Sequence, residues 1–177
     1  MNHLEIDGAL VDITRAACAE CKARLDAVPK ANTTERRAIQ LEYGIYTFCG
    51  NAGLLFNTGW DRTHVFRVRQ NFWNNELHKY PNMHRQYLAL DAEQQACFLA
   101  ALQAELFLHD QWLGAQYDEL AAAETSGDTA RAFEFRIKIG AARHMFDLRE
   151  AWRRENGVFP HMFDGGFHDF REQEVRT

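Results

Sequence analysis

Apolar side chains in residues 9–27 recur every three or four positions, which is the repeat of one helical face. The members of this stripe are Val11, Thr14, Cys18, Cys21 and Leu25. We therefore predict an amphipathic helix over 9–27. A linker follows at 29–34, where Thr33 or Thr34 can cap a second helix that continues to about Gly50.

The longest helical pattern lies between residues 91 and 156. It begins with Asp91 and Gln94, which have the spacing of a capping box. The sequence TSGD interrupts it, and Gly157 stands where a helix commonly ends in a glycine. Two long helices, 91–123 and 128–156, joined by so short a turn predict an antiparallel helical hairpin.

The pattern between residues 57 and 90 is less regular. NTGWD at its start is a turn sequence. Within 62–79, THVFRVRQNF can alternate as a strand, whereas QNFWNNELHK fits a helix better. Pro81 ends this element in either interpretation.

These patterns, with only three Pro in 177 residues, predict an all-α fold. We expect residues 1–157 to form a single-domain bundle of about five to six helices, with the long hairpin as its largest unit. Residues 158–177 are aromatic but not periodic. We expect this C-terminal segment to pack on the bundle through its Phe side chains and to fray at REQEVRT.

The formal net charge is −5, which argues against a protein that coats nucleic acid. The charge is uneven, because residues 60–90 carry five Arg and Lys against two acidic residues. The first ten residues lack the pattern of a signal peptide, and the longest uncharged run, 43–60, is too rich in Gly and Asn for a membrane helix. We therefore expect a cytoplasmic protein with no membrane partner.

Cys18 and Cys21 spell C-x-x-C, and the chain contains two further cysteines. A zinc site would need a second such pair, and a redox motif would need a strand–helix–strand context. Both cysteines also belong to the apolar stripe of the first helix. We interpret them as small apolar residues of a buried helix face.

One group of side chains has the composition of a metal site. Glu105 and His109 are four residues apart in the first half of the hairpin, and His144 and Asp147 are three apart in the second. An antiparallel hairpin with its turn near 125–126 places His109 within about 3 Å of axial rise of His144. Because both histidines fall on apolar stripes, they are either core histidines or, with the carboxylates, ligands of a divalent transition metal.

The doublet His109-Asp110 allows a second interpretation. With His84 or His78 upstream and Asp147 downstream, LFLHDQ resembles the motif of helical HD-type metal-dependent phosphohydrolases. That resemblance implies phosphoester hydrolysis by a metal-activated water. It covers only these positions, and no second histidine doublet follows in the helical region.

Residues 60–90 also mix cations with aromatic rings. Such a mixture is typical of protein interfaces, and less often of single-stranded nucleic acid sites. The alternative is a helix whose rings face the core. We select as candidate partner-binding residues Trp60, Arg67, Arg69, Trp73 and Tyr80.

The motif HMFD occurs twice, at 144–147 and 161–164, and His168-Asp169 follows the second copy. The Gly-Gly pair after Asp164 lets the backbone approach a ligand closely. The tail could therefore complete a site with His144 and Asp147. We favour the simpler interpretation, in which its Phe residues dock on the bundle.

We conclude from the sequence that this is a non-catalytic helical interaction protein, similar in type to an immunity protein, an antitoxin or an adaptor. Its expected partner is another protein, a homodimer is compatible with the pattern, and no cofactor is required. The alternative is a metal-binding bundle or a metal-dependent hydrolase that uses Glu105, His109, His144 and Asp147.

Overall fold

The computed structural model describes residues 1–49, 63–64, 67, 70–71, 74–75, 77–79, 81–102 and 112–158. Every regular element within these ranges is helical, so the all-α prediction is confirmed. The elements are α1 (His3–Ala27), α2 (Thr33–Cys49), the 3₁₀ helix η1 (Leu77–Lys79), α5 (Pro81–Leu88), α6 (Ala92–Leu102), α8 (Gly114–Ser126) and α9 (Thr129–Glu155). No helix in the described ranges is long and apolar enough to cross a membrane.

Helix α1 begins at His3, earlier than the apolar stripe predicts. A capping box explains this start, because the Asn2 side chain accepts the Leu4 and Glu5 N–H groups at 3.0 Å each. The Glu5 carboxylate in turn accepts the Asn2 N–H at 2.7 Å. These local hydrogen bonds satisfy N–H groups that a helix start otherwise leaves open.

Asn32, and not Thr33 or Thr34, caps α2. Its side-chain oxygen accepts the Glu35 N–H at 3.3 Å, and its backbone carbonyl accepts the Arg36 N–H at 3.2 Å. The prediction of a threonine cap was wrong because the helix starts at Thr33 itself. An asparagine immediately before a helix is one of the strongest capping residues.

The α8–α9 connection agrees with the predicted turn. Gly127 has a φ of +73°, which suits glycine, and Asp128 caps α9 by accepting the Arg131 N–H at 3.0 Å. Gly157 follows α9 with a φ of +66°. The predicted capping box at α6 is also present, with Asp91 and Gln94 exchanging hydrogen bonds of 2.8 and 3.0 Å.

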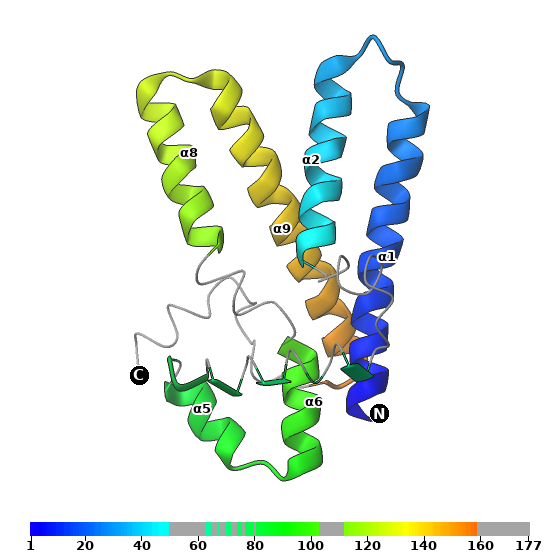
Figure 1. Ribbon diagram of the computed structural model, residues 1–177, viewed down its shortest axis with the longest axis vertical. Coiled ribbons are helices and arrows are strands. Elements are labelled where there is room, and N and C mark those ends of the chain that lie inside the picture. The colour runs from blue at the N-terminus through cyan, green and yellow to red at the C-terminus, as the bar shows by residue number, and fades with distance from the viewer. Residues whose placement is uncertain are drawn as a thin grey trace.

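Two antiparallel hairpins lie side by side, in the order α8, α9, α2 and α1 (Figure 1). The α1–α2 hairpin closes through Arg24 and Glu42, whose side chains are 2.7 Å apart. Helix α6 packs on the N-terminal half of α1, and α5 lies beside α6. The stretch 103–111, which separates α6 from α8, lies outside the described residues, so the single long helix predicted for 91–123 is not tested there.

The core lies where α1, α2, α6 and α9 meet. Its larger apolar side chains are almost completely removed from solvent, for example Leu10, Ile39, Phe98, Leu99 and Phe146. Burial of each contributes about 1.5–3 kcal/mol. On α6 the buried positions facing α1 include Ala96, Ala100 and Ala101, and such small residues let two helix backbones approach closely.

Candidate functional site

The structure places His144 and Asp147 on the solvent side of α9, where both side chains are exposed. The prediction that His144 lies on the apolar face was wrong. The buried face of α9 contains Ala142, Met145 and Arg149 instead. The ring of Tyr46 lies beside the His144 ring, at a centroid distance of 6.2 Å.

Glu105 and His109 lie outside the described residues, and so does Asp110. Of the HD-type motif, His78 is exposed on η1 and His84 is half-buried on α5. Within the described ranges, no three His, Cys, Asp or Glu side chains are grouped so that they could hold a metal ion. The four-residue metal site therefore stays a prediction, and metal analysis of the purified protein with and without His109→Ala/His144→Ala would test it.

Among the candidate partner-binding residues, Arg67 is exposed on a helical segment. Trp60, Arg69, Trp73 and Tyr80 lie outside the described residues, and the C-terminal repeat of HMFD does too. Every described position within 62–79 is helical. The strand alternative for this segment is therefore wrong at those positions.

The C-x-x-C cysteines are buried, as predicted. Cys21 is 1% exposed, and its thiol donates a weak hydrogen bond to the Glu42 carboxylate over 3.7 Å. Burial, reinforced by the negative charge of Glu42, raises the pKa of Cys21 to about 11. Burial also raises the pKa of Cys18. Both groups therefore stay as thiols near neutral pH, which is the unreactive form.

A group of charged side chains is buried where α1, α6 and α9 meet. Arg149 donates to the Thr14 hydroxyl at 2.9 Å, and Arg153 donates to the Ala101 carbonyl at 2.8 Å. Arg153 also pairs with Glu150 at 3.1 Å, and Asp7 of α1 is fully buried too. These guanidinium groups join three helices, so their hydrogen bonds serve the fold.

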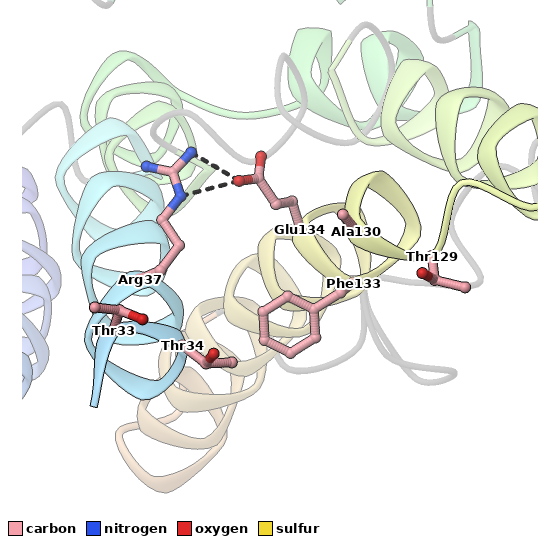
Figure 2. Close-up of a pocket in the computed structure, with 7 residues that line it drawn as sticks. All are labelled: Thr33, Thr34, Arg37, Thr129, Ala130, Phe133 and Glu134. Carbon is pink, nitrogen blue, oxygen red and sulfur yellow. Dashed lines mark hydrogen bonds and ion pairs between the residues drawn. The ribbon is translucent and has the colours of Figure 1, made fainter. Parts of the chain in front are cut away.

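A shallow pocket opens between the N-terminal ends of α2 and α9, with a volume of about 500 Å³ (Figure 2). Its lining residues are Thr33, Thr34, Arg37, Thr129, Ala130, Phe133 and Glu134. Arg37 and Glu134 form an ion pair across it, with two of the three guanidinium nitrogens, Nη2 and Nε, 2.8 and 2.9 Å from one carboxylate oxygen. The two charges neutralise each other, so the pocket offers an aromatic ring and hydroxyl groups to a neutral side chain.

The surface of α5 has a different character. Leu88 is 64% exposed, the largest exposed fraction among the large apolar side chains of the described residues. It lies on one helical face with Pro81, His84 and Arg85, which precede it by seven, four and three residues. We call these four residues the α5 stripe. Sequence periodicity missed this stripe, because one exposed leucine in a short helix resembles a core position.

The opposite face of α5 is firmly held. Met83 and Tyr87 are 1% and 8% exposed, and the Tyr87 ring packs on Phe98 at a centroid distance of 5.5 Å. The Tyr87 hydroxyl donates to the Asn74 side chain. The Gln95 amide donates to the Tyr87 carbonyl at 3.2 Å. The α5 stripe is therefore presented on a helix anchored to the core.

Comparisons of this chain with protein-family models, curated proteins and solved structures found no match.

Proposed function

We propose that this protein is a non-catalytic helical interaction module, of the immunity-protein, antitoxin or adaptor type, which binds another protein in the cytoplasm. The observation that carries the proposal is the exposure of Leu88, at 64%, on a helix that is itself anchored in the core. When a partner covers a large apolar side chain, the free energy of binding becomes more favourable by about 25 cal/mol per Å² of apolar surface removed from water.

Arg85 adds to this argument. It is exposed one turn before Leu88 on the same face. Protein interfaces commonly combine an apolar anchor with an arginine that makes charged hydrogen bonds at its edge. Rigid presentation helps as well, because a preformed helix loses less conformational entropy on binding than a loop does.

The sequence-based candidates Trp60, Arg67, Arg69, Trp73 and Tyr80 belong to the same stretch of chain as the α5 stripe. We propose that they extend its binding surface. The exposed position of Arg67 supports this extension. The α2–α9 pocket is a second opening that could receive a side chain of a large partner, although its ion pair leaves it no net charge.

Site-specific photocrosslinking tests the proposal in the source cells. A photoreactive amino acid replaces the exposed Ala89, which directly follows Leu88 and lies one turn after Arg85. We expect a discrete crosslinked protein, identified by mass spectrometry, whose yield falls at least about tenfold when Leu88→Asp is added. Leu88→Asp is an exposed substitution, so the free energy of unfolding should change by no more than about 0.5 kcal/mol.

The matched control is Tyr117→Asp on α8, which also removes an exposed apolar side chain, 42% accessible, and adds one negative charge. Crosslinking from position 89 should persist in this variant. A crosslink yield that is the same in the Leu88→Asp and wild-type chains would contradict the proposed surface.

A further inference from the structure

Charge is distributed unevenly between the segment that contains α5 and the rest of the protein. Residues 60–90 have a net charge of +3, and the remaining residues together have −8, within a total of −5. The segment is therefore a basic region of an acidic molecule. A region of opposite charge attracts partners that the rest of the surface repels.

The described residues between 63 and 90 include no carboxylate. Arg67 and Arg85 are exposed there, and the neutral polar side chains of Asn71, Asn75 and Gln86 are exposed too. The next carboxylate along the chain, Asp91, already accepts the Gln94 N–H at 2.8 Å as the cap of α6. Arg67 and Arg85 therefore face solvent without an acidic neighbour among the described residues of their own segment.

We infer that the partner presents an acidic segment to the α5 stripe, with an apolar residue flanked by carboxylates. In this complex the apolar residue covers Leu88, and a carboxylate pairs with the Arg85 guanidinium, which can form two parallel hydrogen bonds with it. The inference rests on the proposed function and adds the chemistry of the partner to it.

A protein fits these observations better than a nucleic acid does. Leu88 offers an aliphatic surface next to Arg85, and a sugar–phosphate backbone, which is charged and mainly polar, covers such a surface poorly. A net charge of −8 outside the segment also repels a polyanion as long as DNA. A short acidic segment of a protein can contact α5 without approaching the acidic remainder.

Binding to defined probes tests the inference with the full-length chain. The probe is a fluorescent peptide of about 15 residues with Leu at every fourth position and Glu elsewhere, and its twin has Gln in place of Glu. We expect fluorescence anisotropy to show binding of the Glu peptide at least about tenfold tighter than binding of the Gln peptide. Raising NaCl from about 50 to about 300 mM should weaken it, because salt screens exposed charges.

Variants connect the binding to the α5 stripe. Arg85→Glu should weaken binding of the Glu peptide by at least about tenfold. The matched control is Arg143→Glu, which makes the same charge change at an exposed position of α9 and should alter binding by less than about twofold. Equal binding of the Glu and Gln peptides, or equal effects of the two variants, would overturn the inference.

Two other possible partners of the α5 stripe would give different binding results. Tighter binding of single-stranded oligothymidine than of the Glu peptide, lost in Arg85→Glu, would replace the acidic protein by a nucleic acid. Salt-sensitive self-association that excludes the peptide would replace it by a second copy of this chain. If crosslinking from position 89 captures a partner and depends on Leu88, but the Glu peptide does not bind, the inference about charge fails and the proposed function stands.

Discussion

Arg149 of α9 donates a hydrogen bond to the hydroxyl of Thr14 on α1 over 2.9 Å, and both side chains are completely buried. The Thr14 hydroxyl in turn donates to the Leu10 carbonyl at 3.2 Å within its own helix. A buried guanidinium depends on such acceptors, since water cannot replace them. The contact therefore fixes how α9 lies against α1.

Replacing Arg149 should destabilise the fold more than replacing any exposed arginine does. We expect Arg149→Ala to lower the free energy of unfolding by about 3–5 kcal/mol, because it leaves a cavity and removes a charge from a buried group of polar side chains. Arg143→Ala, at an exposed position of the same helix, should cost no more than about 0.5 kcal/mol. Urea denaturation followed by circular dichroism measures both values.

Thr14 can be tested with nearly isosteric changes. Thr14→Val keeps the shape but removes the acceptor for Arg149, so we expect a loss of about 1–3 kcal/mol in the free energy of unfolding. Thr14→Ser keeps the hydroxyl and should lose less than Thr14→Val. The opposite order would mean that packing of the methyl group, and not the hydrogen bond, is what matters at this position.

Two glycines should respond in opposite directions to the same substitution. Gly127 has a φ of +73° at the end of α8, so Gly127→Ala should lower the free energy of unfolding by about 1 kcal/mol. Gly140 lies inside α9 with no atom within 4 Å of an added Cβ. Gly140→Ala should therefore raise the free energy of unfolding by about 0.5–1 kcal/mol. Thermal unfolding of the two variants under identical conditions compares them, and two shifts of the same sign would contradict the assigned conformations.

Cysteine reactivity should follow burial. Cys18 and Cys21 are 8% and 1% exposed, whereas Cys97 is only half-buried. Burial raises the pKa of all three thiols, and that of Cys21 reaches about 11. At pH 8 we expect iodoacetamide to modify Cys97 before Cys18 and Cys21, which should react only after urea is added, as measured by peptide mass spectrometry.

The same pKa shift predicts how stability depends on pH. The folded chain holds the Cys21 proton more tightly than the unfolded chain, whose thiol titrates near its ordinary value of 9.0. The stabilisation that Cys21 gains from this shift is fully present below pH 9 and is lost as the pH rises toward 11. Cys21→Ser should therefore show a shallower decline in the free energy of unfolding over this interval than the wild-type chain does.

The ion pair across the α2–α9 pocket should contribute little to stability. The Arg37 and Glu134 side chains are 54% and 35% exposed. A double-mutant cycle with Arg37→Ala and Glu134→Ala should give a coupling energy below about 1 kcal/mol, which falls further as salt is added. A coupling energy that is large and insensitive to salt would mean that the pair is shielded from solvent.

Much of the architecture could be predicted because its causes are local. Several helix ends depend on side chains or glycines within three or four residues of them. The starts of α6 and α9 depend on the pairs Asp91–Gln94 and Asp128–Arg131, and the ends of α8 and α9 are marked by Gly127 and Gly157. The apolar stripe of α1 is local in the same sense, and its Thr14, Cys18 and Cys21 are buried. Where two local signals competed, as at Asn32 and Thr33, the structure was needed to choose between them.

The functional surface could not be predicted in the same way. Hydrophobic periodicity placed His144 toward the core and offered no reason to bury Arg149 or Arg153, yet the structure reverses these positions. The long aliphatic part of arginine can occupy a core when acceptors from distant helices meet its guanidinium group. Leu88 shows the converse case, because the core covers the face of α5 that contains Met83 and Tyr87, and Leu88 lies outside it.

The amino-acid sequence alone therefore predicted that the chain is helical, where α6 and α9 begin, where α1 and α9 end, and which segment is basic. Those properties depend on backbone hydrogen bonds and charges close together in the chain. The tertiary structure was needed to show which side of α9 is buried and that Leu88 faces solvent. It was also needed to show that Arg149 donates a hydrogen bond to Thr14, 135 residues earlier in the chain. Burial depends on which distant helix lies opposite a residue, and no local pattern contains that information.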